Sequence, residues 1–186
     1  TCVFHDIDSI PRNDFIMNYK AVHGAVNHLY GYDYALGGIF AIKGGDFEKT
    51  NGFPNNWGWG YEDNELSKRC TKKNIKINRQ DLIHTHDRTK IDRIDEKDDA
   101  TFARYISPKE VIRYIRGTND GLSYIKNLEF SRSGPYLNIF RFQTQYAPER
   151  LVKYSTDLPD FMGNNIGRWV MKNFSLKRIP LSFNIK

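Results

Sequence analysis

The sequence predicts an α/β fold, and three observations support this. Short apolar runs with strand character, such as residues 3–5 and 37–43, occur together with a segment of helical character at residues 61–72. The 186 residues, 39% of them hydrophobic, are enough to bury one core without disulfides or metals. An aspartate pair follows the first strand-like run. In α/β sheets, strand ends open into ligand crevices, so we expect a ligand site there.

The first half of the chain contains four predicted elements. Residues 3–5 form a short apolar strand, and residues 37–43 form a buried strand that opens with two glycines. Residues 45–50 are predicted as a helical turn. Residues 61–72 are predicted as a helix, because acidic residues in a first helical turn are favoured by the helix dipole. Residues 15–30 lack a clean periodicity, so no element is predicted there.

The second half contains one strand, one helical segment and one hairpin. Residues 75–78 alternate as a strand, and the charge-dense residues 87–99 are predicted to be exposed. Residues 100–116 have helical spacing of their apolar side chains. Residues 122–130 and 136–142 flank a turn-forming segment and predict a β-hairpin.

The net charge of +6 is concentrated near the C-terminus. Residues 146–186 hold seven Lys or Arg and three Asp or Glu, which gives +4. Such a segment suits contact with an anionic membrane or a phosphorylated partner, and a solvated basic surface is the alternative. Nucleic acid is not an expected partner, because two of the three tryptophans are grouped with acidic residues. Cys2 and Cys70 form either one disulfide or two reduced thiols, and they are too few for a disulfide scaffold.

Two carboxylates follow the first predicted strand, as Asp6-Ile7-Asp8. Alternation along an extended chain places both on one side. They repel each other unless a cation lies between or beside them, and a divalent ion that carries a nucleotide diphosphate would fill that role. A chance Asp-x-Asp sequence is the alternative interpretation.

His84 and His86 are separated by one residue in a polar loop. In an extended segment this spacing directs both imidazoles toward one metal ion. Together with Asp8 they would form a mixed nitrogen and oxygen site, which suits Mn²⁺ better than Mg²⁺. A pair of surface histidines is the alternative interpretation.

Two tryptophans lie in a glycine-rich turn that leads into acidic residues, Trp57-Gly-Trp-Gly60-Tyr-Glu-Asp-Asn-Glu65. Glycines on both sides of Trp59 allow its indole to point outward. An exposed indole beside carboxylates suits a sugar, whose C–H faces stack on the ring. Glu62 and Asp63 can accept hydroxyl protons, and one could be a general base. Tryptophans buried in the core are the alternative.

The order of these motifs closely resembles the β-1,4-galactosyltransferase family. The residues that carry the resemblance are Phe4-His-Asp-Ile-Asp8, Gly37-Gly38, Asn51-Gly-Phe-Pro-Asn-Asn56, Trp57-Gly-Trp-Gly60, Glu62-Asp63 and Asp120-Gly-Leu122. Members of the family are inverting, metal-dependent sugar transferases of the GT-A fold. The resemblance covers residues 1–142 and implies the C-terminal portion of that fold, a mixed sheet with flanking helices. It implies that the N-terminal nucleotide-binding half lies outside this chain, so we expect the chain alone to be unstable or inactive. It leaves residues 143–186 as a basic extension of unknown role.

The resemblance also assigns roles to individual residues. Asp63 would deprotonate the acceptor hydroxyl, and Glu62 would hold hydroxyls of the donor sugar. Mn²⁺ would be held by Asp8, His84 and His86. The residues expected to bind the UDP-sugar donor or the glycan acceptor are Asp6, Trp59, Gly37, Gly38, Tyr32, Ala35, Asn56 and Gly60.

The sequence departs from the family pattern at two places near the expected site. The acidic run after Asp63 reads Asn64-Glu65, where the family has a further Asp. Ala35 occupies a position that is often Tyr and that restricts the donor sugar, so we expect room for UDP-GalNAc as well as UDP-Gal. The alternative to an enzyme is a carbohydrate-binding relative without activity. The resemblance implies the Golgi lumen for an animal member and leaves the cytoplasm open for a bacterial or viral one.

Overall fold

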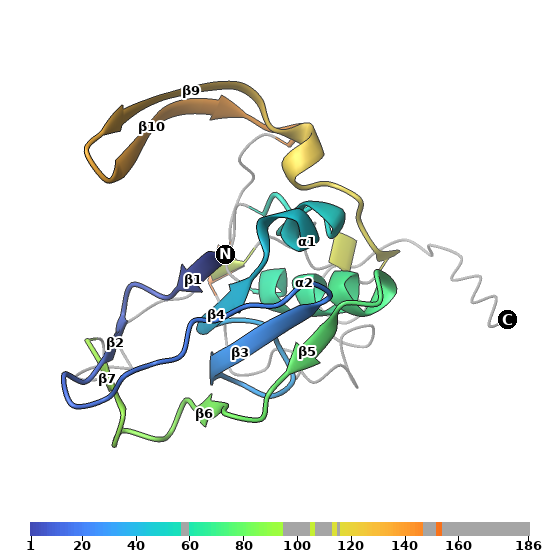
Figure 1. Cartoon of the computed structure of the whole chain (residues 1–186). Coiled ribbons are helices and arrows are strands. Elements are labelled where there is room, and N and C mark those ends of the chain that lie inside the picture. Colours follow the sequence, from blue (N-terminus) through green and yellow to red (C-terminus); the bar gives the residue numbers. More distant parts are fainter. Residues whose placement is uncertain (57–59, 95–104, 107–112, 115, 147–151, 154–186) are drawn as a thin grey trace, which may run out of the picture.

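The computed structural model of this chain describes residues 1–56, 60–94, 105–106, 113–114, 116–146 and 152–153 (Figure 1). The predictions that concern Trp57, Trp59 and most of the basic extension lie outside these residues. No helix within the described ranges is long and apolar enough to cross a membrane.

A mixed sheet of five strands organises the fold (Figure 1). Its order is β1 (Cys2–His5), β4 (Ile39–Ile42), β3 (Ala25–Gly31) and β5 (Lys76–Asn78), and β6 (Ile83–His84) also pairs with β3. Strand β4 is antiparallel to both β1 and β3, whereas β5 and β6 are parallel to β3. The strands predicted at β1, β4 and β5 are confirmed, as is the α/β class. The central strand β3 was not predicted.

The two faces of the sheet bury separate apolar clusters. One cluster contains Val26, Leu36, Phe40, Ile42, Leu66, Cys70 and Ile75. The other contains Met17, Leu29, Tyr30, Ile39, Ile83 and Ile91. Neighbouring residues of β4 contribute to opposite clusters, as the alternation of side chains along a strand requires. The sheet is therefore covered on both sides, which explains why all four residues of β4 are buried.

Two helices follow β4, namely α1 (Gly44–Lys49) and α2 (Glu62–Lys72). Both confirm predicted helical segments. The first turn of α2 is acidic, and the helix buries Leu66 and Cys70, one turn apart, against the sheet. Cys2 and Cys70 are both free thiols, so the structure contains the reduced pair and not a disulfide.

Two short strand pairs lie outside the main sheet. Strand β2 (Ser9–Pro11) pairs with β7 (Ile91–Arg93), and β8 (Tyr105–Ile106) pairs with β11 (Val152–Lys153). The helical segment predicted over residues 100–116, with an interruption at Ser107-Pro108, is therefore wrong at β8, whereas residues 113, 114 and 116 are helical as predicted. The exposed segment predicted at 87–99 is also wrong at Ile91, which is fully buried. In both places pairing with a distant strand decided the local structure.

The predicted hairpin is confirmed. A 3₁₀ turn at Leu122–Tyr124 leads into β9 (Lys126–Ser133), which pairs with β10 (Tyr136–Gln143). The hairpin extends away from the main sheet (Figure 1), and every residue of both strands is exposed. The turn-forming segment between the two runs correctly predicted the hairpin, but residues 122–124 form the 3₁₀ turn and not the start of the first strand.

Candidate active site

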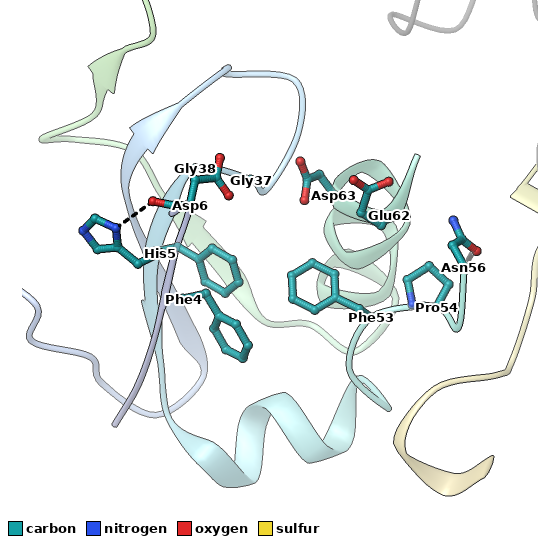
Figure 2. A pocket seen from close by; sticks show the side chains of 11 residues that line it. Phe4, His5, Asp6, Gly37, Gly38, Phe53, Pro54, Asn56, Glu62 and Asp63 are labelled. Atoms are coloured by element: carbon teal, nitrogen blue, oxygen red, sulfur yellow. Dashed lines mark hydrogen bonds between the residues drawn. The ribbon is translucent and has the colours of Figure 1, made fainter. Parts of the chain in front are cut away.

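A pocket of about 420 Å³ lies at the end of β1, between the sheet and α2 (Figure 2). Five parts of the chain line it: the end of β1, the glycine pair before β4, β4 itself, the loop at residues 53–56 and the first turn of α2. The lining residues are Phe4, His5, Asp6, Gly37, Gly38, Phe40, Phe53, Pro54, Asn56, Glu62 and Asp63. The pocket thus combines residues that are far apart in the chain, and several of them are predicted site residues.

Three carboxylates, those of Asp6, Glu62 and Asp63, face this pocket (Figure 2). Burial, followed by the nearby charges of Glu62 and Asp6, raises the pKa of Asp63 to about 7. Burial and the neighbouring Asp8 carboxylate also raise the pKa of Asp6. A carboxyl group with a pKa near neutrality can exchange a proton with a bound hydroxyl, which is what a general base requires.

The glycine pair is needed for the close packing of this pocket. A Cβ at Gly37 would overlap the carboxylate of Asp63, and a Cβ at Gly38 would overlap the carbonyl oxygen of Tyr30. Gly38 also has a positive φ of 74°, which glycine adopts at little cost. Its carbonyl oxygen accepts a hydrogen bond of 3.0 Å from the backbone N–H of Asp6. The two glycines therefore join the end of β1 to the start of α2.

Aromatic side chains form the apolar side of the pocket. The rings of Phe4 and Phe40 are stacked with centroids 4.7 Å apart, and Phe53 approaches Phe4 edge-on at 5.5 Å. Figure 2 shows Phe4 and Phe53 below the carboxylates. Phe40 and Phe53 were not predicted as site residues. Phe40 has no local signal that distinguishes it from a core residue, whereas Phe53 lies within the motif Asn51-Gly-Phe-Pro-Asn-Asn56 that carries the resemblance.

A buried ion-pair network supports the loop at residues 53–56. Arg69 of α2 donates to Glu65 Oε1 at 3.1 Å and to the carbonyl oxygen of Gly52 at 2.8 Å. Its guanidinium also lies 3.7 Å from Asp120 Oδ1. Asp120 in turn accepts a hydrogen bond of 2.6 Å from the backbone N–H of Asn55. Arg69 thereby holds the rim of the pocket without lining it.

The predicted metal ligands are not gathered. The carboxylate of Asp8 forms an ion pair of 3.1 Å with Arg93 and accepts a hydrogen bond of 2.9 Å from Ser9. His84 and His86 are exposed. Among the described residues, no group of three His, Cys, Asp or Glu side chains lies where it could hold a metal ion. The present arrangement of these three residues therefore does not fit a shared ion.

The remaining predicted site residues lie around the pocket or outside the described residues. Tyr32 stacks on Tyr34, and its ring lies 6.4 Å edge-on from His86, so the two predicted site residues Tyr32 and His86 are neighbours. Ala35 is buried, and neither it nor Tyr32 lines the pocket. The carbonyl oxygen of Gly60 accepts a hydrogen bond of 3.4 Å from the Asn56 amide.

Comparison with known proteins relates the middle of the chain to galactosyltransferases. Residues 18–94 match a family model described as the N-terminal domain of galactosyltransferase. Human beta-1,4-galactosyltransferase 4 is 38% identical over 87 residues, which cover 41% of this chain and 25% of that protein. The Cricetulus griseus protein of the same name is 32% identical over 103 residues, covering 46% and 30%. The chain thus aligns with about a quarter to a third of the length of these relatives.

Solved structures agree at the level of the fold. The catalytic domain of Drosophila beta-1,4-galactosyltransferase 7, in complex with xylobiose, matches with a TM-score of 0.50 and 22% identity over 78% of this chain and 67% of that one. A mutant of that enzyme in complex with manganese, UDP-Gal and xylobiose gives the same values. At this identity the likeness shows the fold alone. Together with the sequence matches, it relates this chain to the β-1,4-galactosyltransferases, most directly over residues 18–94.

Proposed function

We propose that this chain is part of a glycosyltransferase that moves galactose or N-acetylgalactosamine from a UDP-sugar to a sugar hydroxyl. The observation that carries the proposal is the pocket in which Asp6, Glu62 and Asp63 meet beside an aromatic wall. The family match supports the reaction class, and the UDP-Gal complex of the Drosophila relative supports the donor class. The buried carboxyl group of Asp63, at the position that the resemblance assigns to the general base, favours an enzyme over a carbohydrate-binding relative without activity.

Asp63 is the proposed general base. Its ionised form would take the proton of the acceptor hydroxyl as the new bond to the anomeric carbon forms, and the UDP group would leave from the opposite side. That single displacement inverts the configuration at the anomeric carbon. Glu62, next to it in the first turn of α2, would accept hydrogen bonds from hydroxyls of the donor sugar. Trp59, from the resemblance, would stack on the sugars.

Manganese is proposed from the resemblance and from the relative solved with manganese. The ligands that the resemblance implies are Asp8, His84 and His86, which the described structure does not gather around one point. Because Asp8 is paired with Arg93 in this structure, binding would require that ion pair to open. Paramagnetic broadening of the His84 and His86 ring signals on addition of Mn²⁺ would support this site. Unbroadened ring signals at saturating Mn²⁺ would contradict it.

The donor sugar is proposed to be less restricted than in relatives with Tyr at the position of Ala35. This part of the proposal rests on the resemblance: Ala35, two residues before Gly37, has only a methyl side chain, and it is buried without lining the pocket. Replacement with the larger ring, Ala35→Tyr, should lower turnover of UDP-GalNAc more than that of UDP-Gal. Equal effects on both donors in a competition assay would remove this part of the proposal.

The central experiment measures UDP release by the longer protein that contains this chain, with a UDP-sugar and a glycan acceptor. Wild-type turnover should rise with pH through about 7, because Asp63 acts as a base only when ionised. The variant Asp63→Asn should lose about 10²-fold or more of the rate, whereas Asp81→Asn, at an exposed carboxylate outside the pocket, should not. Full turnover in Asp63→Asn would show that Asp63 is not the general base.

A further inference from the structure

The segment Ala35-Leu-Gly-Gly38 is here called the glycine turn. Two side chains outside the pocket form hydrogen bonds with its backbone carbonyl groups. We propose that His28 and Arg79 are positioning residues that fix the glycine turn against Asp63. The effect of this positioning on catalysis rests on the proposed function. The positioning itself is a structural claim that can be tested separately.

His28 is fully buried on β3 and reaches the turn through its ring. Its Nε2 lies 2.9 Å from the carbonyl oxygen of Gly37. Its Nδ1 lies 3.2 Å from Nε of Arg79, whose terminal nitrogen also donates to the carbonyl oxygen of Ala35 at 3.4 Å. The two side chains thus bind the carbonyl groups of the first and third residues of the turn.

Arg79 determines which nitrogen of His28 carries the proton. An arginine guanidinium has donors and no acceptor, so His28 Nδ1 must accept from Arg79 Nε. Burial and the Arg79 charge lower the pKa of His28 to about 4, which keeps the ring neutral at neutral pH. A neutral ring with an accepting Nδ1 has its proton on Nε2, and Nε2 therefore donates to Gly37. The pair acts as a directed chain from Arg79 through His28 to the turn.

The fold leaves space for this chain of hydrogen bonds. A Cβ at Gly31 would lie 2.7 Å from the carbonyl oxygen of Gly37 and 2.8 Å from His28 Nε2, so a side chain there would separate the two. The ladder between β3 and β4 also shifts register between His28 and Tyr30. Such an irregularity can redirect a side chain next to a functional site.

The glycine turn also contacts Asp63, the proposed general base. The N–H of Leu36 donates to the backbone carbonyl of Asp63 at 3.2 Å, and the Asp63 carboxylate fills the space where a Cβ of Gly37 would lie. A shift of Gly37 would therefore change the surface against which this carboxylate rests. Small displacements of reacting groups are costly, since about 1 Å can reduce a rate by roughly 10²-fold.

The test compares three variants of the full chain. His28→Leu removes both hydrogen bonds of the ring. His28→Gln keeps an acceptor for Arg79 and a donor for Gly37. His23→Leu changes an exposed histidine whose side chain is 79% accessible, and it is the matched control. The readouts are kcat and KM for UDP-sugar turnover, the tautomer of His28 from proton–nitrogen correlations, and the titration of the Asp63 carboxyl carbon by NMR.

We expect the Nε2–H tautomer in the wild type. His28→Leu should lower kcat by roughly tenfold to hundredfold with KM nearly unchanged, and it should move the Asp63 midpoint away from about 7. His28→Gln should restore both, and His23→Leu should change neither. An Nδ1–H tautomer, or His28→Leu with the wild-type Asp63 midpoint, would overturn the proposal.

Two further outcomes remain decisive. If the longer protein that contains this chain releases no UDP, the proposed function fails, and the Asp63 midpoint in His28→Leu against His28→Gln still decides the positioning. If His28→Leu does not fold, Arg79→Met removes the donor to Ala35 and to His28 from a half-buried position. A changed Asp63 midpoint in Arg79→Met would support the positioning, and an unchanged one would overturn it.

Discussion

Replacing Asp63 with Asn should make the protein more stable above neutral pH, whatever reaction it catalyses. Burial and the charges of Glu62 and Asp6 raise the pKa of Asp63 from 3.8 to about 7 in the folded chain. Below pH 3.8 the carboxyl is protonated in both the folded and unfolded states and costs nothing. Above pH 7 the unfolded chain has a hydrated carboxylate, whereas the folded chain must hold the same charge in a desolvated site. The wild type therefore loses stability as the pH rises from 3.8 through about 7.

The magnitude follows from the difference between the two pKa values. At about 1.4 kcal/mol for each pKa unit, a change from 3.8 to about 7 corresponds to about 4 kcal/mol. Residual solvent contact of the Asp63 side chain weakens the effect, so we expect a gain of about 2 to 4 kcal/mol for Asp63→Asn at pH 8. Because Asn resembles the protonated carboxyl, the gain should nearly vanish at pH 4.

Urea unfolding at pH 4 and pH 8 measures this difference directly. Asp81→Asn, which changes an exposed carboxylate, is the control and should show little pH-dependent gain. The reasoning is refuted if Asp63→Asn gains no more stability than Asp81→Asn between the two pH values. A gain that is larger at pH 4 than at pH 8 would refute it as well, because the sign would be wrong.

Three further predictions concern the packing around the pocket. Gly37→Ala should lower UDP-sugar turnover by about 10²-fold, because the new Cβ would displace the Asp63 carboxylate. Its control is Gly45→Ala in α1, where a Cβ would meet nothing within 4 Å. This control should leave turnover unchanged and stabilise the folded protein by about 0.5 to 1 kcal/mol. Arg69→Met should lower the free energy of unfolding in urea by about 3 to 5 kcal/mol, because it leaves Glu65 and Asp120 buried without their cation. Its control, Arg12→Gln in an exposed ion pair, should lower that free energy by at most about 1 kcal/mol. Leu66→Ala should cost about 2 to 5 kcal/mol through the cavity left under α2, and a loss below that of Arg12→Gln would contradict the assigned core.

Local patterns were sufficient where an element's own residues carry the signal. The acidic first turn predicted the start of α2 within one residue, and the apolar run after the glycine pair predicted β4. Strand β3 was missed because it is buried along most of its length and includes His28, so it lacks the polar and apolar alternation of a half-exposed strand. Strand β8 was assigned to a helix because its pairing with β11 involves residues more than forty positions later.

Some residues of the candidate site were likewise predictable from local motifs, and others were not. The motifs around Asp6, Gly37 and Glu62-Asp63 named the polar side of the pocket, and the structure brings them together. The link from Arg79 through His28 to Gly37 joins three separate parts of the chain, so no local pattern contains it. The ion pair between Asp8 and Arg93, which occupies a predicted metal ligand, likewise spans 85 positions.

By itself the sequence determined the α/β class, the strands and helices with strong local signals, and the acidic residues of the pocket, whereas its glycine pair was implied by the family resemblance. These properties depend on residue types and short spacings, which are read directly from the chain. Only the tertiary structure decided which aromatic rings line the pocket and how far burial raises the pKa of Asp63. It alone also shows that His28 contacts the glycine turn from outside the pocket. Desolvation, charge proximity and hydrogen-bond direction depend on distances through space, and those exist only once the chain has folded.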